Sequence, residues 1–347
     1  MQLNLPIDST TLGSLDNARD RYASDEYSGV GLSVTKRLLG GRFRFESAST
    51  ALLQLVEAAY GGLPRHGFPI SCPEFRIELR LAMPRHTPAG VESAPVQTQT
   101  RTNRPSAVID ASNYVVIAPE KRFATVVISE DTLAHPYHVR YGLIEFAVFI
   151  LAARGLGLAP LHGACVGLNG RGVLLLGASG SGKTTLALHA LLGGFELVAE
   201  DAVFVQPERM LATGVPNYLH LTKDTLRFVD DETRRWISGS PVIRRRSGVE
   251  KFEVDLRQGP RRLAKTPLEL AGAVFVSSRP ADGSKTMHRI PSGKIDSLLS
   301  VDQPYAMTQP GWRDFSRRLK QLGVYELGRQ HPQDALQHLR RLLGQSF

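Results

Sequence analysis

Cysteine is scarce in this chain of 347 residues, and no apolar segment is long. The two cysteines provide no disulfide framework, which favours a reducing compartment, and we expect the cytoplasm. The most apolar stretch, residues 143–153, is interrupted by Glu145 and is too short to cross a bilayer. Residues 1–6 show neither the basic nor the apolar part of a secretion signal. We therefore expect no membrane contact.

Zinc patterns, internal repeats and heptads are also missing from the sequence. His135 and His138 flank a Pro-Tyr pair, but no third ligand lies nearby in the sequence. Because a zinc site needs at least three protein ligands, we predict no metal centre at this pair of histidines.

The positive charge of the chain is concentrated in its second part. Residues 1–145 balance 15 basic against 15 acidic side chains, whereas the remainder has 27 against 18. The densest stretch, residues 234–265, holds ten basic and three acidic groups, with Trp236 and Phe252 as its aromatics. So few aromatic residues disfavour base stacking, and we do not expect a nucleic-acid partner. A solvated surface and contact with a peptide or nucleotide remain alternative interpretations.

A complete phosphate-binding loop lies near the middle of the chain. Residues 172–176 before it predict a buried strand, and residues 185–192 after it predict a helix. Backbone N–H groups and a helix N-terminus then converge on an anion. The motif predicts ATP and Mg²⁺ as cofactors, with Lys183 on the β and γ phosphates and the Thr184 hydroxyl on the metal. The predicted nucleotide-binding residues are Gly177, Ala178, Ser179, Gly180, Ser181, Gly182, Lys183, Thr184 and Thr185.

Two adjacent carboxylates and one histidine complete the predicted site. Glu200 and Asp201 follow a strand predicted over residues 195–199, where Mg²⁺ needs a second anchor. One carboxylate can hold the metal while the other accepts a proton from an attacking hydroxyl. His162 begins a predicted hairpin that leads into the loop strand, so its side chain could reach the nucleotide. Alternatively, a carboxylate only ends the strand and faces water, and the histidine is a hydrogen-bonded residue of the core.

Taken together, these motifs resemble the catalytic core of the HPr kinase/phosphorylase family, which consists of serine protein kinases built on a P-loop. The resemblance is closest to kinase-like relatives in peptide-modification pathways, including kinases of lasso-peptide precursors. It covers residues 160–205, is looser over 206–347 and is absent over 1–140. The segments that carry it are Leu161-His162-Gly163, the Asn169-Gly170 turn, residues 177–184 and Val198-Ala199-Glu200-Asp201.

The resemblance implies roles for individual residues. Lys183 and Thr184 match the family's phosphate and metal residues, and His162 matches its active-site histidine. Glu200 and Asp201 stand where the family has two aspartates, of which the first is the general base, so Glu200 is longer by one methylene. The family's glycine-rich signature segment has no match downstream, and neither HPr as substrate nor the reverse reaction is therefore implied. Homo-oligomers are implied, since relatives with this core form them.

We therefore predict an α/β protein with two domains. Residues 141–347 would form a P-loop kinase domain, with a central mixed β-sheet flanked by helices. Residues 1–140 would form a smaller, β-rich α+β domain for substrate recognition, with an arm over 1–30 and an exposed loop or long hairpin connection over 84–105. The predicted activity is ATP- and Mg²⁺-dependent transfer of the γ-phosphate to a hydroxyl, with serine of a peptide or small protein as the acceptor. A small-molecule acceptor and a nucleotide-gated binding module with slow hydrolysis are the alternatives.

Overall fold

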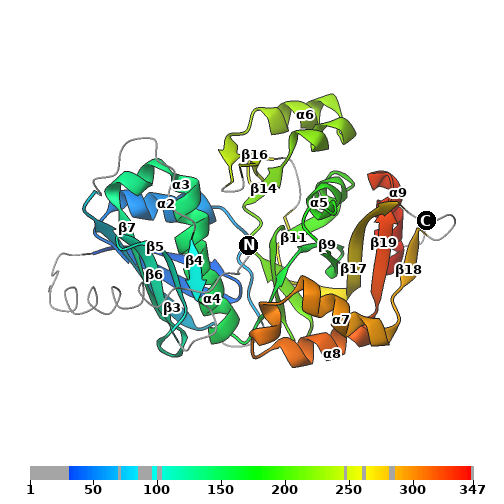
Figure 1. The fold of residues 1–347 in the computed structure, drawn as a ribbon, viewed down its shortest axis with the longest axis horizontal. Helices are drawn as coiled ribbons and strands as arrows, with labels where there is room; N and C mark the ends of the chain where they lie inside the picture. The colour runs from blue at the N-terminus through cyan, green and yellow to red at the C-terminus, as the bar shows by residue number, and fades with distance from the viewer. Residues whose placement is uncertain are drawn as a thin grey trace.

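The structure, a computed structural model, describes residues 31–68, 72–84, 96–99, 104–245, 248–259, 263–280 and 286–344. Within these ranges two large mixed sheets lie side by side, each with helices packed against it, and a third, small sheet lies near both (Figure 1). The predicted α/β class is thus confirmed. The arm predicted for residues 1–30 lies outside the described residues, as does most of the loop predicted over 84–105.

The N-terminal sheet has seven strands among the described residues, in the order β1-β2-β3-β7-β6-β5-β4. Successive residues of β2 alternate between the core and solvent, so that Phe43 and Phe45 are fully buried and Arg42 and Arg44 are exposed. One short strand, β4, occupies part of the predicted loop. The strands are β1 (Leu32–Leu38), β2 (Gly41–Ser47), β3 (Glu74–Ala82), β4 (Gln97–Gln99), β5 (Ser106–Asp110), β6 (Asn113–Ala118) and β7 (Phe123–Ser129).

Four helical segments pack against this sheet or follow it, namely α2 (Thr50–Tyr60), α3 (Pro136–Val139), a π-helical turn (Arg140–Ile144) and α4 (Glu145–Gly155). Almost every side chain of α4 is buried. N-terminal strands cover one side of the helix, and Phe204 packs against Phe149 of the helix, with 5.0 Å between the ring centroids. An apolar helix without a polar face is expected in such a position. Short 3₁₀ helices lie at Pro119–Lys121, Glu130–Ala134, Lys223–Phe228 and Ala306–Thr308.

The second large sheet carries the candidate site. Its main path runs β11-β9-β10-β17-β13-β12-β8, and β19 pairs with both β17 and β18. Parallel pairing of β10 with β17 and of β17 with β19 brings the carboxyl ends of these three strands to one edge. The strands are β8 (Ala159–His162), β9 (Ala164–Leu168), β10 (Arg171–Leu176), β11 (Glu196–Ala199), β12 (Ala202–Gln206), β13 (Leu211–Gly214), β17 (Leu268–Pro280), β18 (Met287–Arg289) and β19 (Val324–Arg329).

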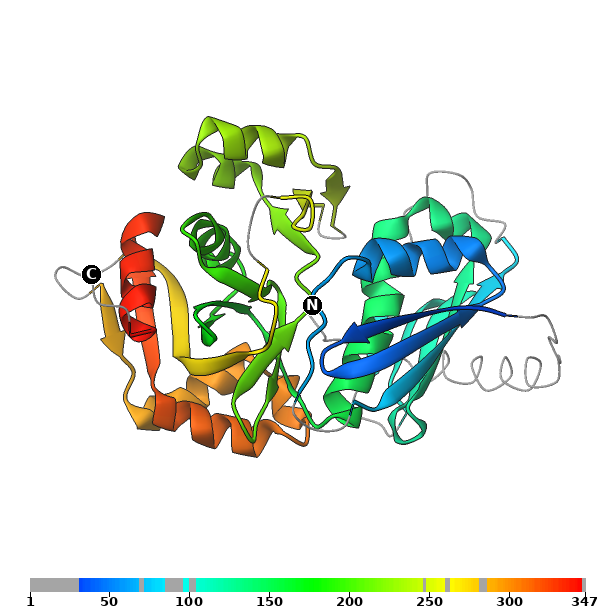
Figure 2. The ribbon, with the colours of Figure 1, turned by 180° about the vertical axis from the view of Figure 1, so that it is seen from behind.

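Helices cover both faces of this sheet, which explains the uninterrupted apolar run of β10. Val173 and Leu175 pack in one core with α5 (Lys183–Leu192) and α9 (Pro332–Leu342). Leu174 and Leu176 pack in another core with α7 (Ser292–Asp302) and α8 (Trp312–Leu322). A strand buried on both faces requires apolar residues at every position. Figures 1 and 2 show the two helix pairs on opposite sides of the strands.

The small sheet has the order β14-β16-β15 and lies to the left of α5 in Figure 1. Its strands are β14 (Tyr218–Leu221), β15 (Val242–Arg244) and β16 (Glu250–Asp255), and α6 (Asp231–Ser238) accompanies them. Asp230 caps α6, since its carboxylate accepts from the Thr233 N–H at 2.7 Å. The basic stretch over residues 234–265 thus extends from α6 through β15 and β16.

A buried polar network joins the small sheet to the N-terminal part of the chain. Arg140 donates to the Glu253 carboxylate at 2.6 Å, and the His220 imidazole lies 3.5 Å from the same oxygen. The Asn217 amide donates to both Glu145 and the Ala59 carbonyl at 3.2 Å. We call this network the seam (Ala59, Arg140, Glu145, Asn217, His220 and Glu253). The ion pair of Arg140 with Glu253 offsets part of the free energy lost when these charges leave water.

Replacing Glu145 with glutamine is expected to flatten the pH dependence of stability. Burial raises the pKa of Glu145 to about 7, against the opposing effects of the Arg140 charge and the Asn217 hydrogen bond. The folded protein therefore holds this proton more tightly than the unfolded chain, and the free energy of unfolding falls as pH rises from about 4.5 to 7. Glu145→Gln should reduce the difference in unfolding free energy between pH 4.5 and pH 8 by on the order of 2–3 kcal/mol.

Urea unfolding of parent and variant at several pH values would measure this effect. Glu120→Gln, which changes an exposed carboxylate, is the matched control and should follow the parent. Parallel curves for parent and Glu145→Gln would contradict the assignment.

Candidate functional site

The predicted phosphate-binding loop connects β10 to α5 at the carboxyl edge of the second sheet. Its glycines Gly177, Gly180 and Gly182 all have positive φ, at 126°, 79° and 104°. Such values are strained for residues with a side chain. At Gly177 a Cβ would also lie 2.6 Å from the Val276 carbonyl oxygen, so glycine is required for the loop to approach β17. The loop thus has the backbone conformation that its glycines predict.

Lys183 folds back over this loop. Its ammonium donates to the carbonyls of Gly177 and Ala178, at 2.5 and 3.1 Å, and the residue is buried. Burial lowers the pKa of Lys183, whereas the charges of Asp302, Asp201 and Glu200 raise it. The two carbonyls therefore hold the ammonium at the loop, where it can meet an incoming anion.

Thr184 and Glu200 meet directly. The Thr184 hydroxyl donates to Glu200 Oε1 at 2.5 Å, which joins the first turn of α5 to the connection between β11 and β12. Burial and then the charge of Asp201 raise the pKa of Glu200, and the Thr184 hydrogen bond opposes them. A raised pKa makes Glu200 a better proton acceptor near neutral pH.

The donor set at this point fits a magnesium ion. A hydroxyl and carboxylate oxygens are hard ligands of the kind that Mg²⁺ prefers. Among the described residues no group of three or more His, Cys, Asp or Glu side chains could hold a metal by itself. This agrees with the usual mode of Mg²⁺, which takes one or two protein ligands and completes its shell with water and phosphate oxygens. Thr184 and Asp201 would be the ligands, with Glu200, which accepts the Thr184 hydrogen bond, on the water shell of the ion.

His162 and Asp201 also lie together. Pairing of β8 with β12 sets His162 opposite Ala202, and His162 Nδ1 is 3.2 Å from Asp201 Oδ1. The two atoms lack hydrogen-bond alignment, and within the described residues this buried nitrogen has no hydrogen-bond partner. Asp201 has a positive φ of 74°, in a turn that the Gly163 N–H holds by donating to the Asp201 carbonyl at 3.2 Å. The structure thus brings together all four residues predicted to be catalytic.

Two further residues were missed by the sequence analysis. Gln303 is buried, and its amide accepts from the His162 N–H at 2.7 Å and donates to the His162 carbonyl at 2.8 Å. It also donates to Asp302 at 2.7 Å, and Asp302 accepts from the Gly177 N–H at 3.2 Å. The end of α7 therefore positions both the histidine and the start of the loop. The signal in the sequence, an apolar helical pattern followed by Asp-Gln-Pro, marks a helix end and nothing more.

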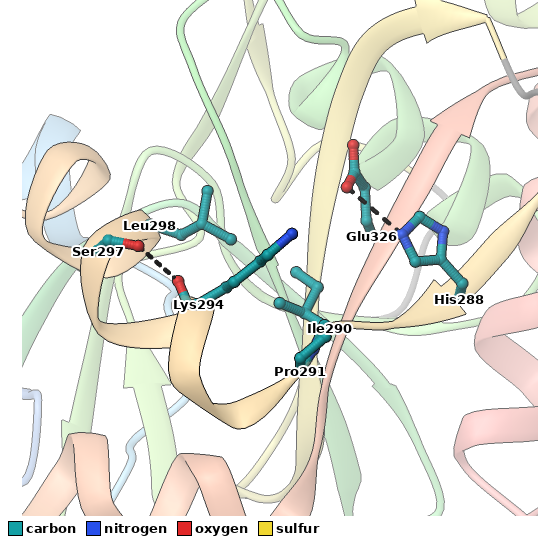
Figure 3. A pocket seen from close by; sticks show the side chains of 7 residues that line it. All are labelled: His288, Ile290, Pro291, Lys294, Ser297, Leu298 and Glu326. Atoms are coloured by element: carbon teal, nitrogen blue, oxygen red, sulfur yellow. Dashed lines mark hydrogen bonds and ion pairs between the residues drawn. The ribbon is translucent and has the colours of Figure 1, made fainter.

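A cavity of about 410 Å³ lies apart from these groups, between α7 and the strands β18 and β19 (Figure 3). His288 and Glu326 face each other across 3.6 Å on one side of it, and Lys294 extends from α7 on the other. None of its lining residues is among those predicted for the site, and the loop contributes none. We therefore do not place the chemistry in this cavity.

The site combines loop N–H groups, an ammonium, a hydroxyl and two carboxylates. This combination suits a protein that binds phosphate with a divalent cation. The chain matches no family model. A similar curated protein is the HPr kinase/phosphorylase of Geobacter sulfurreducens, which is 39% identical over 69 residues. The match covers 20% of this chain and 22% of that protein, so the chain spans about a fifth of the length of the relative. This similarity supports a relation to the HPr kinase-like family weakly and suggests a kinase-like function.

Among the described residues, no helix combines the length and the apolar character that a membrane span requires.

Proposed function

We propose that this protein is an ATP- and Mg²⁺-dependent kinase of the P-loop type, which transfers the γ-phosphate to a hydroxyl. A serine of a peptide or small protein is the proposed acceptor. The observation that carries the proposal is the Thr184–Glu200 hydrogen bond beside Lys183, because it joins the loop to the carboxylate pair. The partial similarity to an HPr kinase/phosphorylase supports it.

In the proposed reaction the loop N–H groups and Lys183 bind the β and γ phosphates. Thr184 and Asp201 would hold Mg²⁺, and the ion would neutralise part of the phosphate charge. Glu200 accepts the proton of the acceptor hydroxyl while the hydroxyl oxygen forms a bond to the γ-phosphorus. The bond between that phosphorus and the bridging oxygen breaks, and ADP leaves with the electron pair. Asp201, with His162 next to it, orients the cation and the acceptor.

Incubation with γ-labelled ATP tests this function. With Mg²⁺ and a mixture of serine-containing peptides we expect a labelled phosphopeptide, and EDTA should remove the label. A phosphorylated metabolite from a metabolite pool, with no labelled peptide, would instead favour a small-molecule acceptor. Slow release of inorganic phosphate alone would favour a nucleotide-gated binding module and contradict the kinase.

A further inference from the structure

A second cavity, of about 390 Å³, lies beside the hairpin of β1 and β2 in the N-terminal sheet. Three consecutive residues of β1 line it, namely Thr35, Lys36 and Arg37, and so do Arg42 of β2 and Arg65, which follows α2. Successive side chains of a strand point to opposite faces of its sheet, so a cavity lined by three in a row lies along the edge of the strand. Since β1 ends the strand order of this sheet within the described residues, the cavity follows a sheet edge.

The described lining of this cavity contains four cations and no carboxylate. Two of the cations pair with glutamates outside the lining, Lys36 with Glu57 and Arg42 with Glu74 at 2.8 Å. Arg37 and Arg65 are exposed and form no ion pair within the described residues. Two cations without a partner therefore remain beside the edge of β1, and this excess of positive charge favours an anionic ligand.

The edge of β1 adds backbone groups to these charges. An edge strand has unpaired N–H and C=O groups, to which an extended chain can add as a further strand. Within the described residues β1 pairs with β2 alone. Carboxylates on the added chain would meet Arg37 and Arg65, since guanidinium groups bind carboxylates with two parallel hydrogen bonds. A small anion would leave the backbone edge unused, so the combination favours an extended acidic peptide.

A short path of contacts connects the cavity to the candidate site. The segment after α2 that lines the cavity continues to His66, whose imidazole lies 2.8 Å from the Thr213 hydroxyl of β13. Gly214, the next residue, packs so closely on β11 that an added Cβ would lie 2.2 Å from the Ala199 Cβ. Glu200 follows Ala199 directly in the chain. The segment after α2 runs between the two large sheets in both views (Figures 1 and 2). An extended chain bound along β1 could therefore continue toward the carboxylate pair.

We propose that the cavity along β1 binds an acidic segment of the peptide acceptor as an added strand. The inference rests on the proposed kinase function and names the chemistry of its substrate. Arg37 and Arg65 pair with carboxylates of the segment, and backbone groups of β1 hold its main chain. The acceptor serine lies in another part of the same peptide, which extends to the carboxylate pair.

Peptide binding in the absence of nucleotide tests the cavity. The probe is a fluorescein-labelled peptide with a run of glutamates and one serine, and fluorescence anisotropy measures its Kd. The same peptide with glutamine in place of glutamate should bind at least about tenfold more weakly. Arg37→Gln and Arg65→Gln should each raise the Kd of the glutamate peptide about threefold, and the double variant about tenfold. Arg80→Gln is the matched control with parent affinity, because Arg80 is an exposed arginine of the same sheet that pairs with Glu78 at 3.0 Å.

The phosphorylation assay with γ-labelled ATP separates this site from the kinase function. The double variant should raise the KM of the glutamate peptide about tenfold and keep the parent kcat and Kd for ATP, because the cavity holds the peptide apart from the reacting atoms. Transfer to serine peptides without any preference for glutamate would contradict the site and leave the kinase function intact. A parent protein that binds the glutamate peptide but transfers no phosphate would contradict the kinase function and leave the site intact.

Four binding results would overturn the proposal. Equal Kd values for the glutamate and glutamine peptides would remove the site, and so would parent affinity in the double variant at an unchanged melting temperature. An equal loss of affinity in Arg80→Gln would show a general charge effect. Undiminished binding of a glutamate peptide with N-methyl groups on alternate residues would exclude strand addition to β1. Binding of a uridine decamer in place of the peptide would assign the cations to nucleic acid.

Discussion

The rate of phosphoryl transfer by the Lys183→Ala protein is expected to fall at least about 10³-fold, down to the background rate of ATP hydrolysis. The substitution removes an ammonium that two loop carbonyls hold in place and whose pKa the charges of three carboxylates raise. Without this ammonium, the negative charge that develops during transfer loses a fixed positive group in a site that is partly shielded from water. Transfer of label from γ-labelled ATP and the Kd for ATP together measure the effect.

Lys223→Ala is the matched control, since it removes an exposed lysine from the same part of the chain. It should transfer phosphate at the parent rate. Parent activity in Lys183→Ala would end the assignment of the loop as the phosphate site.

The second large effect concerns the two carboxylates. Glu200→Gln should lower the rate about 10²–10⁴-fold while ATP affinity stays close to that of the parent, because proton acceptance is needed only during transfer. Glutamine keeps an oxygen that can accept the Thr184 hydrogen bond, so the local structure should persist. Asp201→Asn should weaken Mg²⁺-dependent nucleotide binding as well as turnover. Measurement of kcat and of ATP affinity in both variants separates these roles.

The pH profile provides an independent check on Glu200. A general base must be deprotonated, so the parent rate should fall as pH drops through the pKa of Glu200, which burial raises. Glu200→Gln should lose this acidic limb. If Glu200→Gln retains the parent rate while Asp201→Asn is inactive, Asp201 is the base.

His162→Ala should reduce the rate of phosphoryl transfer without lowering the melting temperature. A large fall in melting temperature would instead assign His162 to the core.

The loop and its surroundings could be predicted because their signals are local. Spacing of glycines, lysine and threonine specifies the loop, and the apolar run before it specifies a strand buried on both faces. The strand that precedes Glu200 could also be found. The structure inserts β9 between it and the loop strand, but its carboxyl end still lies at the same edge of the sheet. Its position at the predicted hairpin and the resemblance both indicated His162, and the structure brings it to 3.2 Å from Asp201.

Contacts between distant segments could not be predicted. Asp302 and Gln303 follow the loop by more than a hundred residues, and their proximity to Gly177 and His162 depends on how α7 packs across the sheet. The basic stretch over residues 234–265 read as one feature in the sequence, but the structure divides it. Arg234 is exposed and pairs with Asp231, while Arg257 contacts Asp255 and the Gly61 carbonyl.

The Gln303 amide has a further consequence for how an acceptor can arrive. β8 lies at the end of the sheet path, and an edge strand normally offers free N–H and C=O groups to which another chain can add. At His162 both groups are already taken by a single side chain, which imitates the peptide unit of a missing strand. Strand addition is therefore blocked beside the histidine. The proposed peptide acceptor would instead bring its hydroxyl across the carboxyl edge of the sheet, end-on to the strands.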